Sequence, residues 1–141
     1  MDSEGQSGSF RVGKMKILGI DYGRKKIGIA FSEGKLANPL GSVKNSGWLE
    51  FKENLGKIIA QEKIGKVVIG ISEGQMGKET REFGEKLKRE IPVLIEFFDE
   101  TLSTQEAQRL SRETGMSRKK RQGLEDAFAA CVMLQSYLDH V

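Results

Sequence analysis

Two apolar runs near the start of the chain predict the first two strands of the fold. Residues 17–20 do not alternate with polar residues, which predicts a strand buried on both faces. Residues 27–31 predict the return strand of a hairpin. Asp21 stands just past the first strand, followed by Gly23. Because ligands bind beside strand ends in open sheets, Asp21 is a candidate for holding a metal ion and a phosphate, although Asp and Gly also serve ordinary turns.

The pattern downstream predicts three strands and four helices. In chain order they span residues 36–43, 48–59, 66–71, 74–90, 93–98, 104–114 and 124–138. Pro39 has no N–H to donate, so the strand that contains it belongs at a sheet edge. The last helix is apolar on every side over residues 127–134 and is expected to be buried between layers, with Asp126 in its first turn. Residues 115–122 are expected to form a mobile basic loop before it.

This order of elements predicts the fold class. A meander of three strands followed by strand–helix units indicates an α/β protein with a mixed sheet covered by helices. The chain of 141 residues is expected to hold one domain, residues 15–141. The polar, Gly/Ser-rich segment before it, residues 1–14, is expected to be disordered or tag-like. No apolar run approaches the ~20 residues needed to span a bilayer. The single cysteine, Cys131, fits a reducing cytoplasm.

Charge adds a candidate partner to this picture. The net charge is +3 and the pI is about 9.0, which permits a polyanionic partner without requiring one. The densest basic runs are Arg24-Lys25-Lys26 and Arg118-Lys119-Lys120-Arg121. Both runs are candidates for contact with nucleic acid, and two solvated loops are the alternative.

Three acids occupy positions that suit metal chemistry. Asp21 follows the first strand, Glu100 follows the last strand, and Asp126 lies on the apolar helix. If these strands are parallel neighbours, the first two acids leave the sheet at one edge, where the last helix can bring the third. Clustered carboxylates need a counter-charge and suit Mg²⁺ or Mn²⁺. Two such ions can activate water and stabilise the leaving oxygen in phosphodiester cleavage.

Each acid also has a plainer explanation. Asp21 can serve the turn, Glu100 can be an ordinary loop residue, and Asp126 can complement the dipole at a helix N-terminus. Glu73 and Asp99, which also follow predicted strands, are further candidates for the acidic site.

The same residues belong to a longer resemblance. From residue 15 to about residue 141 the chain resembles the YqgF family of Holliday-junction resolvase-like nucleases, which have an RNase H-like fold. The matching segments are GIDYGRKKIGIAFS (19–32), NPLGSV (38–43), VVIGIS (67–72), DETLST (99–104) and EDAFAA (125–130). The resemblance implies a five-stranded mixed sheet in the order 3-2-1-4-5, covered by helices on both faces. It also implies that Asp21, Glu100 and Asp126 are catalytic, metal-binding acids.

The function implied by the resemblance is that of a cytoplasmic, Mg²⁺- or Mn²⁺-dependent endonuclease. Its expected substrate is the 5′ end of precursor 16S ribosomal RNA, and resolution of Holliday junctions in DNA is the alternative. The oligomeric state is left open between monomer and homodimer. The family usually has proline at Ser72 and arginine at Thr101. Losing that arginine removes a cation beside Glu100 and is expected to weaken phosphate binding there.

Two other classes of protein stay open at this point. An Asp-x-Gly segment before a hairpin also begins the phosphate loop of actin-like sugar kinases and ATPases, but those need two domains and this chain is expected to hold one. A non-catalytic RNA-binding or ribosome-assembly module would have the same basic runs. Mg²⁺-dependent cleavage that is lost on Asp21→Asn would separate a nuclease from such a module.

Overall fold

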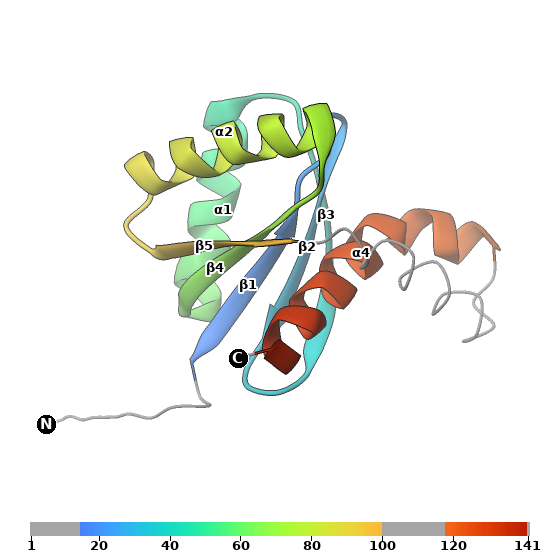
Figure 1. Cartoon of the computed structure of the whole chain (residues 1–141). Helices are drawn as coiled ribbons and strands as arrows, with labels where there is room; N and C mark the ends of the chain where they lie inside the picture. Colours follow the sequence, from blue (N-terminus) through green and yellow to red (C-terminus); the bar gives the residue numbers. More distant parts are fainter. Residues whose placement is uncertain (1–14, 100–117, 141) are drawn as a thin grey trace, which may run out of the picture.

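The computed structural model describes residues 15–99 and 118–140, with the backbone alone for residues 118–126. These ranges hold five strands and three helices (Figure 1). In chain order they are β1 Lys16–Asp21, β2 Lys26–Ser32, β3 Ala37–Lys44, α1 Trp48–Glu62, β4 Ile64–Ile71, α2 Gly74–Glu90, β5 Leu94–Asp99 and α4 Arg118–His140. The expected segment 1–14, the expected helix 104–114 and Glu100 lie outside the described residues.

The strands form one mixed sheet in the order β3-β2-β1-β4-β5, which confirms the expected fold class and strand order. β1 pairs antiparallel with β2 and parallel with β4, and β4 pairs parallel with β5. Every predicted strand of the sheet is present, and each end differs from the prediction by at most two residues. Since β1, β4 and β5 run in the same direction, all three end at the same edge of the sheet.

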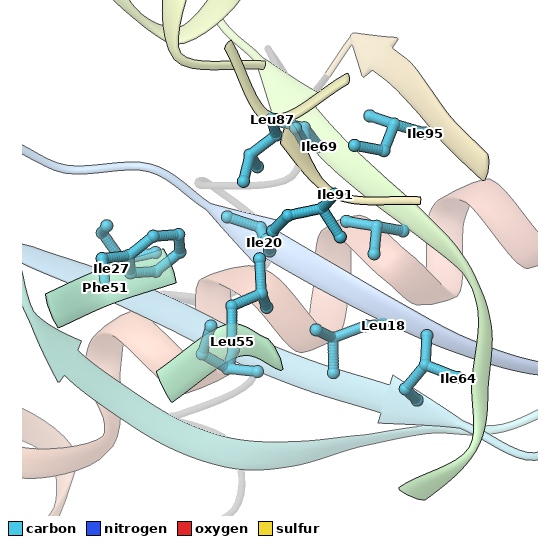
Figure 2. Packing of buried hydrophobic residues seen from close by; sticks show 12 residues of the cluster. Leu18, Ile20, Ile27, Phe51, Leu55, Ile64, Ile69, Leu87, Ile91 and Ile95 are labelled. Carbon is cyan, nitrogen blue, oxygen red and sulfur yellow. The ribbon is translucent and has the colours of Figure 1, made fainter. Parts of the chain in front are cut away.

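Helices cover both faces of this sheet, α1 and α2 on one face and α4 on the other (Figure 1). Because side chains alternate along a strand, neighbouring residues of β1 serve different faces. Leu18 and Ile20 pack toward α1 and α2, whereas Ile17 and Gly19 lie toward α4. Figure 2 shows the cluster of buried side chains on the α1 and α2 face. The residues labelled there are leucine, isoleucine and phenylalanine, and they come from both the sheet and the helices.

The outer strand β3 pairs with β2 in an irregular register. Ile29 lies opposite Gly41, and the next residue of β2, Ala30, lies opposite Pro39. Leu40 is therefore an extra residue on β3, a β-bulge. The bulge and Pro39 agree with the edge position that the proline predicted.

α4 is fastened to the sheet near its C-terminal end by polar contacts. The Ala37 amide donates to Gln135 Oε1 at 2.9 Å, and Gln135 Nε2 donates to the Lys35 carbonyl at 2.9 Å. Tyr137 accepts a hydrogen bond from Lys66 Nζ at 2.9 Å and donates one to Glu96. These contacts join α4 to the β3 end of the sheet and to β4 and β5.

The start of α4 differs from the sequence prediction. The helix begins at Arg118, so the basic run 118–121 forms its first turn and is not a loop. Lysine, arginine and glutamine are good helix formers, and they extend the helix across Gly123. Asp126 is consequently in the third turn of α4, not in the first. The dipole at a helix N-terminus acts within the first turn, so it does not explain an acid at this position.

Candidate active site

Asp21 is the last residue of β1, the central strand of the sheet. Its neighbours across the ladder are Gly28 on β2 and Gly70 on β4, which have no side chains. Ile17 and Gly19 lie on the α4 face, and the alternation of the strand puts Asp21 on the same face. The Asp21 side chain is therefore half-buried at the carboxyl end of the central strand. It lies between two glycines, on the face of the sheet that α4 covers.

The next residue, Tyr22, lies toward the opposite face. Its ring packs against Phe83 of α2, with 4.5 Å between the ring centroids. Trp48 and Phe51 of α1 pack against the same Phe83, so the Trp48 ring is part of the packing between α1 and α2. This aromatic contact anchors the end of β1 beside Asp21.

The ends of β4 and β5 form a pocket of about 300 Å³ on the α2 side. It is lined by Ile71, Ser72, Glu73, Arg81, Phe97, Phe98 and Asp99. The structure thus brings the two additional candidates, Glu73 and Asp99, to one pocket. Asp99 alternates with Phe98, which packs on the α4 face, so it belongs to the face opposite Asp21.

The other two predicted acids are outside the described side chains. Glu100 lies outside the described residues, and Asp126 is described by its backbone alone. Among the described side chains, no three of histidine, cysteine, aspartate or glutamate cluster closely enough to hold a metal ion. A metal centre at Asp21 therefore needs ligands from outside this set.

The basic turn after β1 has a tight backbone. A methyl group on Gly23 would come within 2.4 Å of the Lys26 carbonyl oxygen, so glycine is required by close approach. Asn45 holds the turn from the other side, since its backbone amide donates to the Lys25 carbonyl and its Nδ2 to the Gly23 carbonyl, both at 2.8 Å. Lys25 and Lys26 are exposed on this rigid support.

Arg24, the first cation of the turn, is engaged with α2. Its Nε donates to Glu79 Oε1 at 3.0 Å and its Nη2 donates to Glu79 Oε2 at 2.6 Å. The hydrogen bond to Glu79 raises the pKa of Arg24, and the same bond lowers the pKa of Glu79, so both groups are charged at neutral pH. Sequence reasoning found neither Asn45 nor Glu79. They are 22 and 55 residues away from their partners, with no local motif to mark them.

The chain differs from the usual family pattern at Ser72 and Thr101, and only Ser72 lies among the described residues. Ser72 follows β4, and a methyl group on Gly77 would lie 1.9 Å from its carbonyl oxygen. The start of α2 therefore packs against the Ser72 backbone, which a serine provides as well as a proline would. Thr101 lies outside the described residues.

Two solved structures share this arrangement of sheet and helices. The fowlpox virus resolvase in complex with Holliday junction DNA aligns with a TM-score of 0.57 and 13% identity, over 89% of this chain and 98% of that one. RuvC of T. thermophilus in complex with a Holliday junction substrate aligns with a TM-score of 0.50 and 18% identity, over 89% and 96%. The protein therefore has the RNase H-like fold of RuvC-type resolvases.

Sequence comparison narrows this class to one family. The model of the RuvX family, described as Holliday junction resolvase, matches residues 15–140, and the chain belongs to this family, which is also called YqgF. The enzyme class expected from the sequence, a nuclease that hydrolyses phosphodiester bonds, is thereby confirmed.

Curated relatives of the chain carry the name "Putative pre-16S rRNA nuclease". One from Caldanaerobacter subterraneus subsp. tengcongensis is 35% identical over 89% of this chain and 96% of its own length. One from Syntrophomonas wolfei is 36% identical over 89% and 94%, and one from Endomicrobium trichonymphae is 38% identical over 88% and 95%.

No helix among the described residues is long and apolar enough to cross a membrane.

Proposed function

We propose that the protein is a divalent-metal-dependent endonuclease that acts in 5′-end maturation of precursor 16S ribosomal RNA. The observation that carries this proposal is the place of Asp21. It ends the central strand of an RNase H-like sheet, between two glycines, on the face covered by α4. The names of the relatives support the choice of substrate.

The catalytic acids of the proposal are Asp21, Glu100 and Asp126. Their donor atoms are carboxylate oxygens, which fit Mg²⁺ or Mn²⁺. When bound, such an ion supplies an activated water and stabilises the leaving oxygen of the phosphodiester. The contribution of the chain is to hold Asp21 on a rigid strand, so that the carboxylate needs little ordering at the moment of reaction.

The register of α4 supports the participation of Asp126. Position 126 lies one turn before Ala130 and two turns before Met133, and both of these are fully buried against the sheet. Residues four and seven apart share one face of a helix, so position 126 belongs to the side of α4 that covers the sheet. Asp21 lies on that same covered face. The chain also leaves β5 at Asp99, one residue before Glu100.

The basic residues of the proposal bind the nucleic acid backbone. Arg24, Lys25 and Lys26 follow Asp21 within five residues on the rigid turn, and Arg118, Lys119, Lys120 and Arg121 lie in the first turn of α4. Cations held on fixed elements can bind successive phosphates. They position the nucleic acid without reading its bases. We further propose that residues 15–141 act as one domain.

A DNA substrate is the second candidate. The family description and the two structural neighbours concern Holliday junctions, and a junction resolvase would need two active sites and therefore a homodimer. A monomer suffices for cleavage of one RNA strand. A non-catalytic RNA-binding module is the third candidate.

One assay separates the candidates. The wild type is incubated with Mg²⁺ and either a 16S precursor bearing its 5′ extension or a synthetic four-way DNA junction. We expect cleavage of the RNA, and a loss of more than about 100-fold in Asp21→Asn, because even outer-shell partners of metal ligands contribute 10–100-fold. Asp139→Asn, the same substitution at the exposed end of α4, is the matched control and should cleave normally. Cleavage of the junction alone would favour the resolvase, and binding without any cleavage would favour the module.

A further inference from the structure

The ion pair between Arg24 and Glu79 has the geometry of a guanidinium bound to a phosphate. Two neighbouring N–H groups of Arg24 donate to the two carboxylate oxygens of Glu79, at 3.0 Å and 2.6 Å. Arginine binds carboxylate and phosphate through the same two-pronged arrangement. The carboxylate of Glu79 therefore occupies the place on Arg24 that a substrate phosphate would take.

The backbone of the turn is held by contacts other than this ion pair. The side chain of Arg24 is 63% exposed and that of Glu79 is 25% exposed, and exposed ion pairs contribute little to stability. The backbone of the turn is held by Gly23 and by the two hydrogen bonds from Asn45, not by Glu79. Arg24 can thus exchange partners while Lys25 and Lys26 stay in place.

We propose that Glu79 is a positioning residue that holds Arg24 in the free protein and gives it up to a phosphate of the nucleic acid. This proposal rests on the nucleic-acid binding of the proposed function. The exchange replaces one anion on Arg24 by another. Contact with Arg24 therefore adds less to the free energy of nucleic-acid binding than contact with a cation that has no ion-pair partner. A substrate must therefore supply enough other phosphate contacts to displace Glu79, which favours an extended or folded strand over a short one.

The exchange has a signature in the salt dependence of binding. A cation that meets a phosphate releases a counterion from the nucleic acid, which makes affinity fall more steeply with salt. When Arg24 leaves Glu79, the freed carboxylate takes up a cation from solution and cancels part of that release. Removing the charge of Glu79 should therefore make the salt dependence steeper.

The test compares two variants of one helix. Glu79→Gln keeps the shape of the side chain and removes its charge. Glu82→Gln removes the same charge from an exposed glutamate three residues further along α2. Fluorescence anisotropy measures binding of labelled poly(U) and of a four-way DNA junction over a salt titration, with Ca²⁺ in place of Mg²⁺.

We expect Glu79→Gln to bind about two- to five-fold more tightly than Glu82→Gln, the size of an exposed ion pair. The slope of log affinity against log salt on poly(U) should steepen by up to about 0.7, the value for one phosphate contact on a single strand. In an Arg24→Gln background the added Glu79→Gln change should have no larger effect than Glu82→Gln, because Glu79 acts through Arg24.

Other results would overturn the proposal. If Glu79 only braces the fold, Glu79→Gln will melt at a lower temperature and bind more weakly than Glu82→Gln. Equal affinities and slopes for the two variants, with a wild type that binds, would refute the exchange and leave the proposed function intact. A wild type that binds neither probe would refute both.

Discussion

The two faces of the central strand differ in what they contribute. Toward α1 and α2, β1 places Leu18 and Ile20 in a cluster of large side chains. Toward α4, it places Ile17 and then Gly19 and Asp21, and the partners of these last two on β2 are the small residues Ala30 and Gly28. Large side chains bury much apolar area, whereas small ones let a helix backbone come close to the sheet. The first face is therefore built for stability, and the second for placing α4 over the strand that ends in Asp21.

The largest effect on stability should come from the α1/α2 face. Leu18 is fully buried, so Leu18→Ala removes buried methyl groups and leaves a cavity, at an expected loss of about 2–5 kcal/mol. Urea unfolding measures this loss. Well below the melting temperature, the folded variant should keep its cleavage rate within a few-fold, because the substitution lies on the face opposite Asp21. A variant that is inactive while still folded would contradict this division of roles.

Substitution of the neighbouring residue, Gly19→Ala, should lower stability less than Leu18→Ala and lower activity more. A methyl group on Gly19 would lie 3.0 Å from Leu134 Cβ, so Gly19→Ala must push α4 outward, at an expected loss of about 1–3 kcal/mol. Cleavage should fall more than in Leu18→Ala, because α4 carries Asp126, one of the proposed catalytic acids. Unfolding and cleavage assays on both variants give the comparison.

A second variant controls for the effect at Gly19. Gly65→Ala meets the Met15 side chain at the same 3.0 Å, but the Met15 side chain is exposed and can move aside, so this change should be nearly neutral. Normal activity in the single Gly19→Ala variant would show that the position of α4 does not matter.

The smallest effect should appear where Tyr137 attaches α4 to the sheet. Burial raises the pKa of the Tyr137 phenol, and the hydrogen bond to Tyr137 raises the pKa of Lys66. Both pKa values lie above those of the unfolded chain, so the unfolded state loses these protons first as the pH rises. The stability from this contact is therefore complete below about pH 10 and is lost above it.

The variant Tyr137→Phe tests this contact. It should lose about 1 kcal/mol near neutral pH, the net value of a hydrogen bond, and its unfolding free energy should fall less steeply than that of the wild type above pH ~10. Urea unfolding between about pH 8 and 11 measures both. Parallel curves for the two proteins would mean that the Lys66–Tyr137 contact does not govern stability at high pH.

Much of the fold could be predicted because it depends on local patterns. The apolar runs around Ile20 and Ile69 predicted strands, and Pro39 predicted the edge. The strand order came from the family resemblance, since nothing local states which strands pair. The sequence prediction is wrong at the start of α4, because a run of like charges is typical of a solvated loop, whereas lysine, arginine and glutamine also favour a helix.

Less of the candidate site than of the fold could be predicted from the sequence. Asp21 could be found because it follows directly on a buried strand. Asn45 and Glu79 could not, because their partners are brought close only by the folded chain. The catalytic roles of Glu100 and Asp126 are predictions that follow from the family resemblance.

The irregular edge of β3 has a consequence for how the protein behaves in a crowded solution. An exposed strand edge is a template for pairing with a strand of another molecule, which leads to aggregation. On β3, Pro39 lacks an N–H, and the bulge at Leu40 interrupts the regular spacing of hydrogen-bonding groups. Leu40 is 42% exposed, so an even edge here would present an apolar residue to that pairing. A break of one residue thus lets the protein keep an apolar side chain at this open edge while the β3 edge is a poor template for pairing with another strand.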